Sequence, residues 1–247
     1  MTARLTQIWR HPIKSHGHEA LQQVRLEQGR TMPWDRTWAV AHEGAKADGS
    51  AWASCANFSR GAKAPALMAI DATLDEASET ITLRHPEQAD ISLHPERDAT
   101  QLIEWARPLM PQDRAQSSRV VRVPDRGMTD TDFPSISIAN LASNAAVETV
   151  LGQTLSPRRW RANLWLDGLE PWAEFDWIGK TLAIGDVRLE VRERITRCLA
   201  TTANPQTGAR DADTLGALKS WDHQDFGIYA TVTQTGDIHV GDTLQVL

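Results

Sequence analysis

Short segments in which apolar and polar residues alternate dominate this chain and constrain its fold most strongly. Residues 5–9, 23–27 and 80–83 alternate in this way, and each is bounded by Gly, Pro or charged residues. Successive side chains of a strand point to opposite faces of a sheet, so this pattern predicts half-buried β-strands. Further strands are expected in the C-terminal half, at residues 163–166, 181–184, 187–191, 229–233 and 243–247. The expected fold class is mainly β (α+β).

Two segments show helical spacing instead. Residues 99–110 place apolar side chains on one face, and Pro111 is expected to close this helix. A second helix is expected over residues 140–151, with Gly152 as its C-terminal stop. Helices are therefore few and short in the expected fold.

Turn-rich segments divide the chain. Residues 123–132 are polar and are predicted to link two domains, residues 1–125 and 126–247. Residues 185–186 and 235–237 are typical of tight hairpin turns, because Gly and Asp tolerate the positive φ that such turns need.

Composition excludes some classes of function. The 247 residues carry a formal charge of −6 with an isoelectric point near 5.7, which argues against nucleic-acid binding. No apolar segment reaches the ~20 residues needed to span a bilayer, and no signal-peptide pattern precedes the first expected strand. We therefore expect a cytoplasmic protein with no nucleic-acid and no membrane partner.

The chain has only two cysteines, which is too few for a disulfide framework or a four-thiolate zinc site. Cys198 follows Arg197, whose charge would stabilise a thiolate, the form that binds soft metals or attacks electrophiles. A buried structural thiol is the alternative for Cys198. For Cys55 packing is the expected role, and a place at a pocket mouth is the alternative.

Several spaced motifs resemble one family. The segment Arg197-Cys198-x-x-Thr201-Thr202-x-x-Pro205-x-Thr207-Gly208 resembles the MOSC domain, as do residues 160–164, 226–229 and 236–242. Residues 12–15 (Pro-Ile-Lys-Ser) and 34–38 (Trp-Asp-Arg-Thr-Trp) resemble markers of the β-barrel domain that precedes it. Within this family the layout is most similar to the mitochondrial amidoxime-reducing component and its bacterial relatives. The resemblance implies an N-terminal β-barrel domain followed by a MOSC β-barrel domain with a few short helices.

The resemblance also implies a molybdenum cofactor, molybdenum–molybdopterin. Cys198 would be both the metal ligand and the catalytic residue, since a soft thiolate suits such a centre. The implied cofactor-binding residues are Lys14, Ser15, Arg36, Ser135, Ser137, Arg161, Asn163, Arg197, Cys198 and Tyr229. The chain departs from the family pattern at Ala162 and Thr196, where relatives have proline, and also at Cys55.

Alternatives exist for individual residues. Arg161 and Asn163 are expected on one strand, so that both side chains face the pterin. Lys14 also fits a solvated turn, Arg36 an ion pair with a carboxylate, and Tyr229 a half-core position with a hydrogen-bonded tip.

The resemblance implies a molybdenum-dependent oxidoreductase that reduces small N-oxygenated substrates, either N-hydroxylated compounds or N-oxides. The sequence has neither an iron–sulfur nor a Gly-x-Gly-x-x-Gly pattern, so a separate electron donor of ferredoxin, flavin reductase or cytochrome b5 type is expected. The alternative function is a carrier of the molybdenum cofactor, or a sulfur-transfer protein with a persulfide on Cys198.

Overall fold

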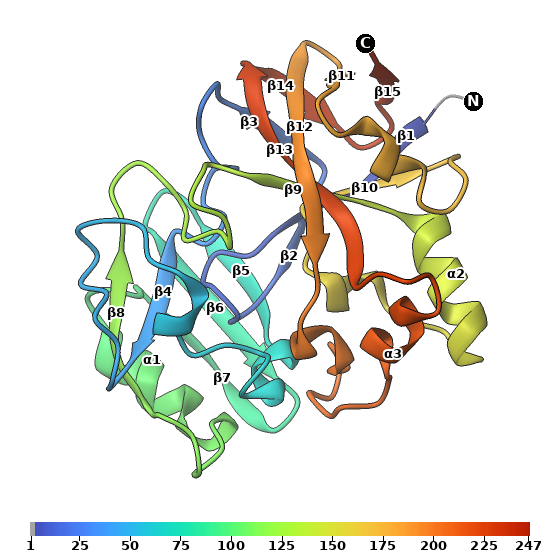
Figure 1. Cartoon of the computed structure of the whole chain (residues 1–247). Coiled ribbons are helices and arrows are strands. Elements are labelled where there is room, and N and C mark those ends of the chain that lie inside the picture. The colour runs from blue at the N-terminus through green and yellow to red at the C-terminus, as the bar shows by residue number, and fades with distance from the viewer. Residues whose placement is uncertain (1–2) are drawn as a thin grey trace.

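The computed structural model describes residues 3–247, and its centre is a closed β-barrel (Figure 1). Around the barrel the strand order is β10-β9-β13-β12-β11-β15-β1, and β1 closes the ring by pairing with β10. The pairing of β9 with β10 is parallel and the others are antiparallel. The barrel strands are β1 (Ala3–Arg10), β9 (Ile136–Asn140), β10 (Leu164–Asp167), β11 (Thr181–Ile184), β12 (Val187–Thr196), β13 (Asp225–Gln234) and β15 (Thr243–Val246).

Apolar side chains of these strands fill the barrel. Leu182 and Ile184 of β11 alternate with outward residues and are fully buried, as the period-2 pattern predicts. In β1 the register against β10 shifts between Leu5 and Gln7, so Leu5 and Ile8 both point inward although they are three residues apart. Burial of each of these aliphatic side chains stabilises the folded state by about 1.5–3 kcal/mol.

Three smaller sheets lie beside the barrel. Strand β2 (Glu19–Leu21) extends β1 outward, and β3 (Gln23–Leu26) pairs with β14 (Gly236–His239). The other two sheets join β4 (Trp38–His42) with β8 (Ser117–Arg122), and β5 (Asp71–Asp75) with β6 (Thr80–His85) and β7 (Gln88–Leu93). The fold is mainly β, as expected. Because β1 closes the barrel of the C-terminal half, the two halves share a sheet, and the boundary at 125/126 stays a prediction.

The expected helix over residues 99–110 is shorter than predicted. The α-helix α1 spans Ala99–Ala106, and one 3-10 turn follows it, because Pro108 cannot donate a backbone hydrogen bond. The second helix, α2 (Leu141–Leu151), is confirmed: Asn140 caps it and Gly152 ends it with φ +65°. The remaining helical segments are η1 (Cys55–Asn57), η2 (Pro65–Ala69), η3 (Arg107–Leu109), η4 (Pro157–Trp160), η5 (Ala173–Trp177), η6 (Leu199–Thr202) and α3 (Thr214–Lys219).

Strand expectations hold in the C-terminal half with two differences. Strands β12 and β13 are each 10 residues long, about twice the expected length. The hairpin expected at residues 235–237 is wrong, because Gly236 begins β14 and that strand pairs with β3 rather than with β13. The hairpin at Gly185 is confirmed, with φ +53° between β11 and β12. In the part of the chain that the structure describes, no helix is long and apolar enough to cross a membrane.

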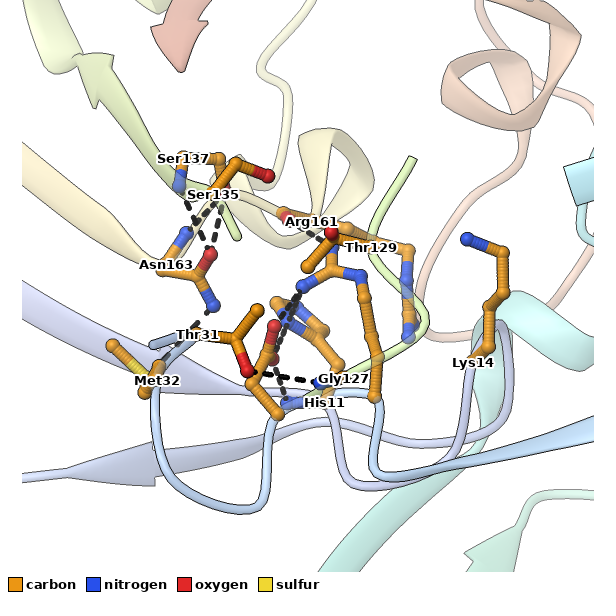
Figure 2. Close-up of polar contacts among 12 residues, drawn as sticks. His11, Lys14, Thr31, Met32, Gly127, Thr129, Ser135, Ser137, Arg161 and Asn163 are labelled. Carbon is orange, nitrogen blue, oxygen red and sulfur yellow. Dashed lines mark hydrogen bonds and ion pairs between the residues drawn. The ribbon is translucent and has the colours of Figure 1, made fainter. Parts of the chain in front are cut away.

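The segment at residues 123–135 is packed against the N-terminal half. Gly127 donates its backbone N–H to the Thr31 hydroxyl (Figure 2). Met128 donates its backbone N–H to the Arg36 carbonyl. A Cβ at Gly127 would lie 2.1 Å from the Asp35 carbonyl oxygen, so only glycine allows this approach. This contact places the following residues at the cavity described below.

We expect Gly127→Ala to destabilise the fold by about 3 kcal/mol, because backbone atoms on both sides of the contact must move. The midpoint of urea unfolding would measure the change. Gly44→Ala is the matched control, since its new Cβ would meet only the His42 ring, at 3.6 Å. Equal midpoints for the two variants would contradict the tight packing of this segment.

Candidate functional site

A cavity of about 230 Å³ opens where the ends of β9, β12 and β13 meet loops of the N-terminal half. Its walls come from both halves of the chain. Eight of the ten predicted cofactor-binding residues line it, namely Lys14, Ser15, Arg36, Ser137, Arg161, Arg197, Cys198 and Tyr229.

Cys198 lies two residues after the end of β12, with an extended backbone at φ −123° and ψ 176°. Its side chain is exposed in the cavity, so the alternative of a buried structural thiol is wrong. The backbone around it is held on both sides: Arg197 donates its N–H to the Gln224 carbonyl, and Thr201 donates to the Cys198 carbonyl. The thiol is therefore accessible on a fixed backbone.

Arg159 braces the loop that follows Cys198. Its guanidinium donates to the carbonyls of Thr201 at 3.0 Å and Ala203 at 3.3 Å, and it pairs with Asp211 at 3.1 Å. Arg159 is 2% exposed and also lines the cavity. Sequence reasoning missed it. The available signal was the run of arginines at 158, 159 and 161, but only the 3-10 turn η4 decides which of them turns inward.

Arg161 and Arg197 present unpartnered donors to the cavity. Arg197 donates through Nε to the Phe226 carbonyl and through Nη1 to the Trp160 carbonyl, and its Nη2 is buried without a partner. The Nη2 of Arg161 is also buried and unpartnered. Burial lowers the pKa of Arg197 to about 10, and burial together with the charge of Arg36 lowers the pKa of Arg161 to about 9. Buried donors without acceptors are costly, so both side chains fit an anion in the cavity.

Arg36 pairs with the buried Asp35, as the ion-pair alternative predicted, and it also lines the cavity. Its second nitrogen donates to the Arg161 carbonyl at 3.0 Å. Burial by itself would raise the pKa of Asp35, but the Arg36 guanidinium and hydrogen bonds from His11 hold it well below its usual range. Arg36 is thus fixed by one charged partner and one backbone partner.

Three cavity-lining residues have left-handed backbones, Ser15 at φ +63°, Arg36 at φ +54° and Arg161 at φ +51°. Non-glycine residues rarely adopt this region, and strained conformations cluster at functional sites.

Lys14 is 3% exposed, so the alternative of a solvated turn is wrong. Its ammonium group donates to the Met128 carbonyl at 2.7 Å and to the Asp130 carboxylate at 2.5 Å. Burial opposes the ionisation of Asp130, but the charges of Lys14 and Arg36 lower its pKa to about 2. Asp130 is the only carboxylate that lines the cavity within the described residues.

Asn163 and Ser135 do not line the cavity. The expected strand starts only at Leu164, and Arg161 ends η4, so Arg161 and Asn163 do not share a strand face. Asn163 accepts from the Ser137 hydroxyl at 2.7 Å and donates to the Trp9 carbonyl at 3.1 Å. Figure 2 shows Asn163 turned toward Ser137 and Met32. Asn163 therefore positions the neighbouring strand.

Ser135 is 2% exposed and its hydroxyl accepts a hydrogen bond from Thr131 at 2.7 Å. Tyr229 is partly buried at the cavity, where burial and then the Asp130 charge raise the pKa of its hydroxyl. Tyr229 is therefore protonated at neutral pH and available as a hydrogen-bond donor.

A further wall comes from residues 55–68. Cys55 lines the cavity and is partly exposed, so the expectation that it packs in the interior is wrong. The Arg60 guanidinium donates to its Sγ at 3.0 Å. With Lys14, Arg36, Arg159, Arg161 and Arg197, Arg60 makes six cationic side chains against one carboxylate. The cavity is strongly suited to an anion.

Known proteins are similar in sequence to part of this chain. Mitochondrial amidoxime-reducing component 1 of Mus musculus is 30% identical over 153 residues, which cover 56% of this chain and 44% of that protein. Its counterpart in Homo sapiens is 30% identical over 130 residues, or 47% of this chain and 38% of that protein. The matched region thus spans less than half of the length of these relatives.

The crystal structure of the YUAD protein from Bacillus subtilis shares the fold at a TM-score of 0.51 and 13% identity, covering 100% of this chain and 96% of that chain. Residues 2–116 match the MOSC N-terminal beta barrel domain and residues 126–245 match the MOSC domain. The chain therefore belongs to the MOSC family, with distant similarity to mitochondrial amidoxime-reducing components 1 and 2.

Proposed function

We propose that this protein is a cytoplasmic oxidoreductase that binds the molybdenum cofactor and reduces small N-oxygenated compounds with electrons from a separate donor protein. The observation that carries the proposal is the exposed Cys198 thiol in a cavity with six cationic side chains. A thiolate is the ligand type for molybdenum, and the cations suit a phosphate and the edge of a pterin.

The residues that line the cavity would contact different parts of the cofactor. Lys14 and Ser15 would bind the phosphate, while Arg36 and Arg161 would bind the phosphate or the pterin edge, where a planar fork fits two acceptors. The unpartnered Nη2 of Arg161 supports this role. Ser137 lines the same cavity, and its hydroxyl is hydrogen-bonded to Asn163.

Other residues hold the lining side chains and loops in position. Asn163 holds Ser137, and Arg159 braces the loop after Cys198. When bound, the cofactor would supply two-electron oxygen-atom chemistry. The chain itself would orient the substrate, and the protonated Tyr229 would donate a hydrogen bond to the oxygen of its N–O group. The Arg197 charge would stabilise the Cys198 thiolate.

The test uses protein purified from a host that makes the cofactor. We expect close to one molybdenum and one pterin per chain, measured by metal analysis and by pterin fluorescence. With reduced viologen as electron source the protein is expected to reduce a simple amidoxime, and nicotinamide cofactor alone is expected to give no turnover. Protein loaded with cofactor that reduces neither amidoximes nor N-oxides would contradict the proposed activity.

The second candidate is a cofactor carrier or sulfur-transfer protein. The exposure of Cys198 beside Arg197 favours it, because an accessible thiolate also forms persulfides. A labile +32 dalton sulfur on Cys198 that passes to an acceptor, found by mass spectrometry without any turnover, would support this candidate instead.

A further inference from the structure

Arg60 is a cation of the cavity that does not belong to the proposed cofactor cradle, which consists of Lys14, Ser15, Arg36 and Arg161. Among residues 3–247 its guanidinium makes one hydrogen bond, from Nη1 to the Cys55 sulfur at 3.0 Å. It forms no ion pair with any carboxylate between residues 3 and 247. The side chain is only partly buried, and its other nitrogens remain free to donate. A cation held in this way has capacity for an anion from outside the chain.

The position of Arg60 is fixed beside the loop of Cys198. Arg210 donates to the Ala62 carbonyl at 3.0 Å and also to the Leu199 carbonyl, so one guanidinium ties the two loops together. A Cβ at Gly61 would lie 3.5 Å from the Ala200 side chain. Arg60 therefore stands next to the segment that carries the thiol, on a wall separate from Lys14 and Arg36.

Each of the other five cations has an acidic partner or a role in the proposed function. Lys14, Arg36 and Arg159 each pair with an aspartate. Arg161 belongs to the proposed cradle and Arg197 would stabilise the Cys198 thiolate, and each has a buried Nη2 that lacks a protein partner among the described residues. Arg60 has neither an acidic partner nor a place in that cradle. A guanidinium in a partly desolvated cavity binds carboxylates through two parallel hydrogen bonds, which gives both affinity and orientation.

We propose that Arg60 binds a carboxylate on the substrate, so that the substrates of this protein are N-oxygenated compounds that carry an anionic group. The inference rests on the proposed function for the reaction itself. It adds the substrate class and a residue that determines specificity. Cys55 orients the guanidinium by occupying one of its nitrogens, and the remaining nitrogens face the substrate.

The test compares two aryl amidoximes that differ only in a para carboxylate. Calorimetry on the oxidised holo protein gives the two dissociation constants, and turnover with reduced viologen gives the two KM values. The unaltered protein is expected to bind the carboxylated compound more tightly. In Arg60→Gln this preference is expected to fall by about 10- to 100-fold, and Arg60→Lys is expected to recover part of it.

Lys63→Gln is the matched control, because it removes the same charge from the same loop at an exposed position outside the cavity. It is expected to leave both dissociation constants unchanged. The inference is overturned if the unaltered protein shows no preference for the carboxylate, if Arg60→Gln keeps that preference, or if Lys63→Gln loses it equally. A protein that turns over neither compound contradicts the proposed function, while the binding constants still decide the role of Arg60.

Discussion

Replacement of Cys198 with serine is expected to lower amidoxime turnover by more than ~100-fold, while the protein still folds. Changes that only disturb the partners of a metal ligand cost about 10- to 100-fold, so removal of the ligand atom itself should cost more. The fold should survive because the side chain is exposed and contributes little to the core. Turnover with reduced viologen, the metal–sulfur spectrum and the urea midpoint would measure the three effects.

Cys55→Ser is the control for this experiment, since it removes the other thiol of the cavity. It is expected to keep the metal–sulfur spectrum of the unaltered protein. If Cys198→Ser also kept that spectrum and its full molybdenum content, Cys198 would not be the ligand.

Arg161→Ala and Arg36→Ala are each expected to weaken cofactor binding by roughly 10- to 150-fold, because each removes a charge-assisted contact of about 1.5–3 kcal/mol. Pterin fluorescence after dialysis would measure retention. Arg158→Ala is the matched control, since this neighbouring arginine pairs with Asp71 and does not line the cavity. Full retention in both cavity variants would mean that the cradle is assigned wrongly.

The same two variants should differ in their effect on the stability of the cofactor-free protein. Arg36→Ala leaves the carboxylate of Asp35, which is 1% exposed, without its charged partner, and is expected to cost about 3–5 kcal/mol. Arg161→Ala removes an unpartnered buried donor, so the free energy of unfolding should stay level or rise. Urea unfolding would separate the two. A loss of stability in Arg161→Ala as large as in Arg36→Ala would show that Arg161 has an intrachain partner.

Local features of the fold could be predicted from the sequence because their causes lie within a few residues. The short apolar segment at residues 181–184 suffices to predict β11, and Asn140 with Gly152 suffices to define the ends of α2. The helix predicted at residues 99–110 is longer than the observed one. The apolar spacing continues past Pro108, but this proline ends the regular α-helix. Strand existence was easier to predict than strand pairing, since β14 pairs with a strand far away in sequence, Gly236 lying opposite Leu26.

The sequence by itself determined that this chain is mainly β, that its motifs resemble the MOSC family, and that Cys198, Lys14, Arg36 and Arg161 are the candidate site residues. Residue types and spacing carry that information directly. The tertiary structure alone decided that β1 closes the barrel and that Asn163 turns away from the cavity toward Ser137. It also decided which other charged side chains reach the cavity: Arg60, Asp130 and Arg159. These features depend on which distant segments pack together, and long-range pairing leaves no periodic pattern in the sequence around each residue.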